Sequence, residues 1–466
     1  MELPYDKTNA RSIEAYAKQL LDKSLHDIFG DDIVHVRKGK GKFGQLVEEL
    51  YFKYKPNSDA LPDFPEAGVE LKTTPMKEIK KGYVPKERLV FNIIDYEKEY
   101  QYSFPQSSFW KKNALLLLMF YLYEEQKLDV DYIFKIIRLW RFPVADLKII
   151  KDDWEKIVAK IKDGKAHELS EGDTLYLGAC TKGANSETTR SQPFSEVPAK
   201  QRAFSLKPKY ISFIINKSLT EAEVLIDERE YEDLLQVGEP SVSYIRKKLD
   251  NIEPVVKEVS DYKKGETFED LVVRKFKPYY GYTEKQLTQE FQIDTKAKNK
   301  FEIVAKAILG VKNKKIEEFE KADVLMKTIR LEENGSIREH MSFRQIQFND
   351  IVNEDWEEST WYWELNRKFF FVVFQKDANG ILKLDRVLFW NIPEKDFDIL
   401  EEVWNDTKMK IANGDFTHFI KASENKIGHV RPKGRNSDDK MLAPNGTMQK
   451  KKCFWLNKTY IKAAIS

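Results

Sequence analysis

The sequence predicts a mixed α/β protein (α+β) built from two copies of one domain. At 466 residues the chain is too long for a single ordinary core. Segments with helical and with strand periodicity are interspersed along it, which indicates helices packed on sheets. Short matches recur once at an offset of 250 to 256 residues, a period far beyond solenoid repeats that indicates a duplicated domain.

Hydrophobic periodicity places the main elements along the chain. The expected helices are 9–25, 44–51, 152–161 and 397–412, and the expected strands are 68–73, 88–95, 115–122, 323–330, 368–375 and 385–392. We expect a first domain at 1–215, a charged helical connector at 216–260 and a second domain at 261–466.

The duplication depends on several anchors. The anchor pairs are Val69-Glu70-Leu71-Lys72-Thr73 with Val324-Leu325-Met326-Lys327-Thr328, Lys112 with Lys368, Trp154 and Gly164 with Trp404 and Gly414, Lys182-Gly183 with Lys433-Gly434, and Phe204 and Tyr210 with Phe454 and Tyr460. Coincidence explains one such pair easily, but not so many at a nearly constant offset.

The first copy carries an acid–lysine pattern that the second copy lacks. Glu70 and Lys72 are two apart on an expected strand and share one face, while Val69 and Leu71 face the core. Asp63 arrives from the preceding loop. Two carboxylates can hold Mg²⁺, and an adjacent lysine can stabilise a phosphate under attack. The alternative is a solvated edge strand with ordinary surface charges.

In the second copy the corresponding positions carry other residues. Leu325 replaces Glu70, Lys306 lies opposite Glu48, and Glu318 is the nearest counterpart of Asp63. An apolar side chain and a cation cannot bind Mg²⁺. Because Lys327, Lys368 and Lys433 persist, we expect a catalytically inactive domain that still binds phosphates.

Composition limits the other classes of protein. The net charge of +2 does not indicate a nucleic-acid partner by itself, so a DNA-binding face must come from local segregation of charge. Two cysteines, the absence of an apolar signal core, and a longest apolar run of ten residues (114–123) favour a soluble, cytoplasmic protein without a membrane contact. The six histidines show no metal-ligand spacing.

Seven blocks in one order resemble the MutH family, which contains mismatch-repair nicking endonucleases and the GATC-cutting type II restriction endonucleases of the staphylococcal kind. The blocks are GKFGQLVEEL (41–50), DFPEAGVELKTTP (63–75), RLVFNIIDYEKE (88–99), DDWEKI (152–157), GKAHELSEG (164–172), CTKGANS (180–186) and AKQRAFSLK (199–207). The resemblance covers most of the first 215 residues and continues more weakly to the C-terminus. It implies a restriction-endonuclease-like core, with Mg²⁺ as the cofactor.

The resemblance also implies roles for single residues. Asp63 and Glu70 would bind the metal together with the Leu71 carbonyl, and Lys72 would stabilise the transition state. Glu48, with Glu49 as its rival, would supply a third carboxylate. The family carries a second active-site lysine. Lys112 is its approximate counterpart, because Lys111 lies next to it and could also be matched.

DNA-binding residues are expected in three places. The base-reading loop and its neighbouring strand contribute Lys182, Gly183, Asn185, Ser205 and Lys207, the glycine-rich loop contributes Lys40 and Lys42, and the second copy contributes Arg431, Lys433 and Arg435. A lysine can donate to guanine O6 and N7 in the major groove. Cys180 and Ser205 stand where the mismatch-repair members carry an arginine and a methylation-sensing tyrosine, so methyl discrimination is in doubt.

The leading hypothesis is a type II restriction endonuclease that makes Mg²⁺-dependent double-strand cuts at GATC, 5′ of the guanine. Its partner is double-stranded DNA, and the chain is expected to be a monomer in solution that dimerises on DNA. The inactive copy would be an allosteric DNA-binding domain. The alternatives are a repair nicking enzyme and a non-catalytic DNA-binding regulator.

Overall fold

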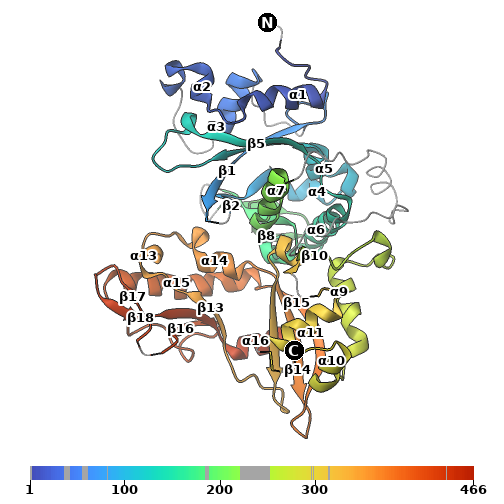
Figure 1. Cartoon of the computed structure of the whole chain (residues 1–466), viewed down its shortest axis with the longest axis vertical. Helices are drawn as coiled ribbons and strands as arrows, with labels where there is room; N and C mark the ends of the chain where they lie inside the picture. Colours follow the sequence, from blue (N-terminus) through green and yellow to red (C-terminus); the bar gives the residue numbers. More distant parts are fainter. Residues whose placement is uncertain are drawn as a thin grey trace.

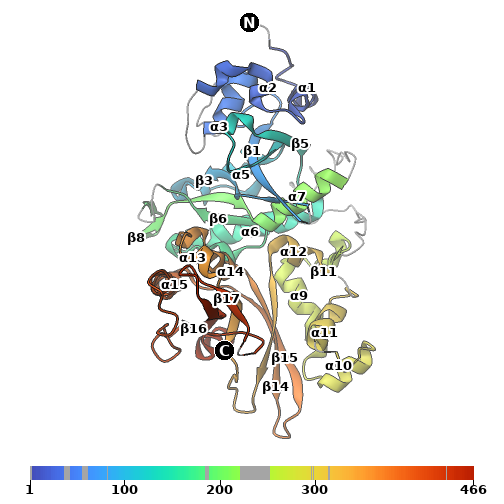
Figure 2. The same cartoon turned by 60° about the vertical axis from the view of Figure 1, so that its left-hand side comes forward.

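The computed structural model describes residues 3–35, 42–54, 61–80, 82–183, 188–220, 252–294, 296–297, 299–312, 315–436 and 438–466. The first copy (blue to green) lies above the second copy (yellow to red) in both views (Figures 1 and 2). The α/β prediction is confirmed, since both copies consist of sheets covered by helices.

The first copy contains two main sheets. One has the order β2-β1-β4-β5, in which β1 and β4 are parallel and the other neighbours are antiparallel; the second has the order β3-β9-β6. Its strands are β1 (Glu70–Ile79), β2 (Gly82–Pro85), β3 (Leu89–Ile93), β4 (Leu116–Leu122), β5 (Ile133–Trp140), β6 (Leu177–Thr181), β7 (Thr189–Gln192), β8 (Ser195–Lys200) and β9 (Arg202–Leu206). Its helices are α1 (Ala10–Ala17), α2 (Leu25–Phe29), α3 (Lys42–Leu46), α4 (Tyr96–Glu99), α5 (Ser108–Asn113), α6 (Val144–Lys162) and α7 (Pro208–Thr220).

Strand β4 forms the centre of the first copy because it is apolar on both faces. Leu117 and Met119 pack with the N-terminal helices, whereas Leu116, Leu118 and Phe120 pack with the larger core on the other side. A continuous apolar run is typical of a strand that is buried on both faces. This strand holds β1, and with it the acid–lysine pattern, at a fixed register.

The second copy repeats this topology. The order β12-β14-β15 reproduces β1-β4-β5, with the same parallel and antiparallel neighbours, and β13-β19-β16 reproduces β3-β9-β6. Its strands are β10 (Ile252–Glu253), β11 (Lys315–Ile316), β12 (Leu325–Leu331), β13 (Met341–Gln345), β14 (Phe369–Lys376), β15 (Leu382–Trp390), β16 (Gly428–Pro432), β17 (Lys440–Leu442), β18 (Met448–Lys450) and β19 (Lys452–Leu456). Its helices are α9 (Phe268–Phe276), α10 (Glu284–Glu290), α11 (Lys300–Ile308), α12 (Glu317–Ala322), α13 (Phe348–Ile351), α14 (Thr360–Leu365), α15 (Phe397–Ala412) and α16 (Lys458–Ile465).

Even the irregularities recur in both copies. The register of the β4–β5 pair shifts after Phe120, and the β14–β15 pair shifts after Val373, at the equivalent position. The β3–β9 and β13–β19 pairs also shift at equivalent positions, after Val90 and Ser342. Shared bulges at matching positions are a strong indication that one ancestral domain was duplicated.

Two expectations about elements need correction or stay untested. The helix expected at 9–25 ends at Ala17, and after a short 3₁₀ turn Leu21 forms a bridge with Phe134. The helical connector falls largely on residues 221–251, which lie outside the described residues.

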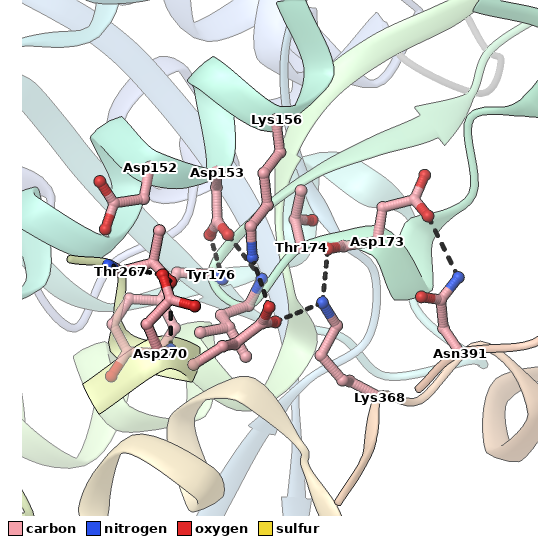
Figure 3. A network of polar contacts seen from close by, with 12 residues as sticks. Asp152, Asp153, Lys156, Asp173, Thr174, Tyr176, Thr267, Asp270, Lys368 and Asn391 are labelled. Carbon is pink, nitrogen blue, oxygen red and sulfur yellow. Dashed lines mark hydrogen bonds and ion pairs between the residues drawn. The ribbon is translucent and has the colours of Figure 1, made fainter. Parts of the chain in front are cut away.

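Buried polar contacts join the two copies. Lys321 of α12 contacts Asp146 of α6 at 2.8 Å, and both side chains are buried. Nearby, Glu269 of α9 accepts hydrogen bonds from Lys368 at 2.6 Å and from Lys156 of the first copy at 2.8 Å (Figure 3). Lys368 also donates to the Asp173 carbonyl. The interface therefore contains a network of paired charges, and a single apolar core that includes residues of both copies adjoins it.

Candidate active site

The acid–lysine pattern converges at the beginning of β1. Lys72 Nζ lies 2.7 Å from Glu70 Oε1, which confirms that these two side chains share one face of the strand. The backbone N–H of Asp63 donates to Glu70 Oε2 at 3.1 Å, and the Asp63 carboxylate accepts from the Leu71 N–H at 2.9 Å. Asp63, Glu70 and Lys72 therefore meet in one place, and both acids are buried.

A tight turn before β1 brings Asp63 to this place. Phe64 and Val69 form an isolated antiparallel bridge, and Gly68 between them has a positive φ of 64°. A non-glycine residue pays a steric cost in this conformation. The turn fixes Asp63 beside the edge of β1 that faces away from β4. The Leu71 N–H points to this edge, so the Leu71 carbonyl lies on the same side.

Glu48 approaches from a short π-helical segment, Val47–Tyr51. Burial, with the negative charge of Asp63 next, raises the pKa of Glu48 to about 7. Glu49 is exposed, so Glu48 is the carboxylate that turns towards the acids. Single π-helical turns inside helices are frequent at functional sites, because they redirect one side chain without breaking the helix.

Glu70 is the most buried acid of the group. Burial raises its pKa to about 7, although the ammonium groups of Lys72 and Lys112 oppose that shift. Lys112, in the last turn of α5, lies 3.7 Å from the same Glu70 oxygen that contacts Lys72. The site thus contains the carboxylates of Glu48, Asp63 and Glu70. The ammonium groups of Lys72 and Lys112 lie beside them.

The donor set suits a hard divalent cation. Asp63, Glu70 and the Leu71 carbonyl offer only oxygen ligands, as Mg²⁺ prefers. Among the described residues, no three acids, histidines or cysteines already stand close enough to hold an ion together. Glu70 is instead engaged by Lys72, so ion binding would compete with this lysine for the carboxylate.

The second copy has the same backbone at this place but different side chains. Leu325 pairs with Phe369 as Glu70 pairs with Leu116, and Lys327 occupies the register position of Lys72. The turn before β12 also repeats, with Asp323 in the left-handed conformation of Gly68. Glu318 corresponds to Asp63, but its carboxylate accepts from the backbone N–H groups of Val255 and Val256. No acid remains at the Glu70 position.

The match of Lys112 to Lys368 is wrong. The Glu70 N–H donates to the Leu115 carbonyl, and the Leu325 N–H donates to the Lys368 carbonyl, so Lys368 corresponds to Leu115. Helices α5 and α14 both begin after a capping serine, Ser107 and Ser359, which places Glu364 opposite Lys112. Lys368 is buried in the interface between the copies and is not available to a phosphate.

The loop after β6 is exposed at its beginning. The Lys182 N–H donates to the Gln201 carbonyl, which fixes the backbone while leaving the side chain in solvent. Lys433 has the equivalent bond, to the Lys451 carbonyl, and its side chain is exposed as well. Gly183, Arg431 and Arg435 are also exposed. These positions are accessible to DNA.

Two expected DNA-binding residues are buried. Ser205 is 2% exposed within β9, and Lys207 donates to the Thr174 carbonyl inside the fold. Burial, with Lys368 nearby, lowers the pKa of Lys207 to about 8. The structure contradicts direct DNA contact by either side chain, because alternation in β9 and the packing of the second copy place them inside.

Three further expectations lie outside the described residues. Asn185 and Lys40 are not described, and neither is the side chain of Lys42. Sequence reasoning did not single out Trp455 as a candidate site residue. Trp455 lies 250 residues after Ser205, the same offset as the neighbouring anchors, and so occupies the position of Ser205 in the second copy. Sequence reasoning also missed Glu364, because the repeat was aligned there by lysines rather than by helix caps. Within the part of the chain that is described, no helix has the length and apolarity needed to cross a bilayer.

Comparisons with known proteins agree with this architecture. The family model of the DNA mismatch repair enzyme MutH matches residues 52–153, a range that contains Asp63, Glu70, Lys72 and Lys112. The chain is 34% identical over 510 residues to the type II restriction enzyme Sau3AI of Staphylococcus aureus, and the match covers 98% of each chain. The chain belongs to the MutH-related family of type II restriction endonucleases, the site-specific deoxyribonucleases.

Proposed function

We propose that this enzyme makes Mg²⁺-dependent double-strand cuts in DNA at GATC, on the 5′ side of the guanine. The observation that supports metal-dependent hydrolysis is the convergence of Asp63, Glu70 and Lys72 at one edge of β1. The target sequence and the cut position come from the resemblance of the ordered sequence blocks. They are therefore the parts of the proposal that need direct mapping.

Each residue of the site has a separate task in this proposal. Asp63, Glu70 and the Leu71 carbonyl would hold Mg²⁺, which when bound supplies charge neutralisation and an acidified water. Lys72 lies against Glu70 and would orient the attacking water or stabilise the phosphorane charge. Lys112 would neutralise the buried Glu70. Glu48, with a raised pKa, would accept or donate a proton near neutrality.

A plasmid digestion tests the reaction. Wild-type enzyme with Mg²⁺ should convert a GATC-containing plasmid to linear fragments whose both strands are cut 5′ of the guanine. Glu70→Ala should be inactive because a metal ligand is lost, while specific DNA binding remains. Glu49→Ala is the control variant and should cleave like wild type, because Glu49 is an exposed glutamate next to the site residue Glu48. Cleavage by Glu70→Ala at a rate near wild type would refute the site.

We also propose that the second copy is a non-catalytic DNA-binding domain that stimulates the first. Supporting this role, the Glu70 position is Leu325, the Asp63 equivalent Glu318 is engaged by backbone N–H groups, and Arg431, Lys433 and Arg435 are exposed. With one active centre per chain, two chains would pair on DNA to cut both strands. Replacing Lys433 and Arg435 with alanine should remove the stimulation.

The same digestion separates the alternatives. A repair nicking enzyme would yield open circles cut on one strand, and a non-catalytic regulator would leave the plasmid supercoiled. The repeated sheet topology of a second copy favours the restriction enzyme over the nicking enzyme, since a nicking enzyme needs only one copy. The intact acids and lysines of the first copy oppose the regulator.

A further inference from the structure

One face of the β13-β19-β16 sheet carries a tryptophan among cations. Phe454 and Leu456 of β19 belong to the core of the second copy, so Trp455 between them points to the opposite face. His429 pairs with Trp455 across the strands, and Arg431 pairs with Cys453 on the same face. We call this surface the Trp455 face; it consists of the exposed Arg431 and Lys433 and the partly exposed His340, Ser342 and Trp455, while His429 is buried.

The cations of the Trp455 face are held in place by the indole ring. The Arg431 guanidinium carbon and the Lys433 ammonium each lie 5.4 Å from the ring centroid of Trp455. Lys433 also donates to the Ser342 hydroxyl at 2.6 Å. A cation over a tryptophan ring is attracted by its quadrupole and loses little further freedom when it binds an anion.

This charge is not neutralised within the protein. Neither Arg431 nor Lys433 forms an ion pair with a carboxylate of the described residues, and both side chains are exposed. Burial, with Arg431 and Lys458 nearby, lowers the pKa of His340 at the edge of the face. After burial, the charges of Arg431 and Lys458 contribute to this shift, and an anion bound beside them would offset their contribution.

The corresponding face of the first copy is closed. There Ser205 and Cys180 occupy the positions of Trp455 and Arg431, and both are buried. Arg88, which corresponds to His340, pairs with Glu171 at 3.0 Å and lies 4.4 Å from the ring of Trp363 of the second copy. One sheet face is thus covered in the first copy, whereas its counterpart in the second copy buries His429 and Cys453 but exposes the side chains of Arg431 and Lys433.

We propose that Trp455, Arg431 and Lys433 form the contact of the second copy with a DNA duplex, with Trp455 positioning both cations. This inference rests on the proposed function and names the surface responsible for it. The occupant is duplex DNA rather than an acidic protein segment, because Lys182, the equivalent of Lys433, lies at the same exposed position in a copy that cuts DNA. Phosphates and guanine edges are both acceptors for such cations.

The test counts duplexes bound by the full chain without metal. A short target duplex titrated calorimetrically should bind wild type at two per chain. The triple variant Trp455→Ala/Arg431→Gln/Lys433→Gln should bind one, while Trp455→Phe should keep two because it retains an aromatic platform. Lys462→Gln, an exposed cation on α16, is the matched control and should also keep two. Thermal unfolding of each variant checks that the second copy is folded.

The outcomes separate the proposal about this surface from the proposed two-site function on which it rests. If the folded triple variant still binds two duplexes, the Trp455 face is not the DNA contact of the second copy, whereas the two-site function is retained. One duplex on wild type would overturn the two-site function, and this surface with it. For Arg431→Gln/Lys433→Gln, the slope of the logarithm of the second binding constant against the logarithm of salt concentration should fall by about two.

A second readout does not depend on stoichiometry. Duplex binding at the Trp455 face should raise the pKa of His340, because phosphate charge offsets Arg431 and Lys458. Histidine-labelled NMR titrations of the metal-free protein, assigned with His340→Gln, should show this rise on adding duplex. An unchanged His340 pKa at saturating duplex would place the second duplex elsewhere.

Discussion

One carboxylate oxygen of Glu70 accepts a hydrogen bond from Lys72 at 2.7 Å and lies 3.7 Å from the ammonium group of Lys112. Its pKa is nevertheless raised to about 7, because burial outweighs both cations. A carboxyl that ionises near neutrality is only partly available as a metal ligand at neutral pH. The protonation state of the metal-free site therefore depends on pH near neutrality.

Magnesium binding should consequently strengthen as the pH rises from 6 to 8. Protonated Glu70 must ionise before it can bind the cation, and its raised pKa costs about tenfold in apparent affinity at pH 6 relative to pH 8. Calorimetry in two buffers of different ionisation enthalpy should show proton release on Mg²⁺ binding below pH 7. Equal affinity at both pH values, without proton release, would contradict the raised pKa of Glu70.

Lys182 should affect the choice of sequence more than the strength of binding. Its side chain is exposed on a backbone that is fixed to Gln201. A good base contact is worth about 1–3 kcal/mol of discrimination against the wrong base. Lys182→Ala should therefore reduce the ratio of cleavage between the target and one-base variants. Equal losses on target and variant duplexes would make Lys182 a phosphate contact.

At the scale of elements, the sequence was sufficient for segments with a strong pattern. The helix at 397–412 and the strands β4, β12 and β14 lie where periodicity places them, and β4 and β14 are long apolar runs that leave few alternatives. The β3-β9-β6 sheet was predicted only in part, since the β3–β9 pairing joins residues at least 110 positions apart, such as Ile93 and Ala203. The acid–lysine pattern was found from alternation within one strand, whereas the burial of Ser205 and Lys207 depends on the second copy, which local pattern does not reveal.

Lysines that look alike in the sequence should differ in their effect on stability. Lys368→Met removes one of the two cations that contact half-buried Glu269 and leaves Lys156 as the other, so the cost should lie below the roughly 3–5 kcal/mol typical of breaking a fully buried pair. Lys327→Met is the matched control. Burial lowers the pKa of both lysines, but among the described residues only Lys368 of the two forms an ion pair with a carboxylate, so removal of Lys327 should cost little. Urea unfolding of both variants measures the difference, and equal midpoints would contradict the interface network.

At the scale of the whole molecule, the proposed single active centre of each chain would have to cut two antiparallel strands. If a second bound duplex promotes pairing of two chains, plasmids with two target sites should be cut faster per site than one-site plasmids. An added short target duplex should stimulate one-site cleavage, as expected for a coupling free energy between two DNA sites. Identical rates for one-site and two-site plasmids, with no response to added duplex, would reduce the second copy to structural support.

The contact between Lys321 and Asp146 has a consequence for a shortened chain. A stop codon after residue 220 would remove Lys321, the buried cation that contacts Asp146, and would expose the apolar core that the two copies share. Losing a buried cation and exposing apolar core surface both destabilise a fold. The first copy thus depends on the second copy to cover its core. Residues 1–220 expressed alone should therefore be recovered as aggregate, and recovery of this fragment as a soluble, cooperatively folded monomer would contradict that dependence.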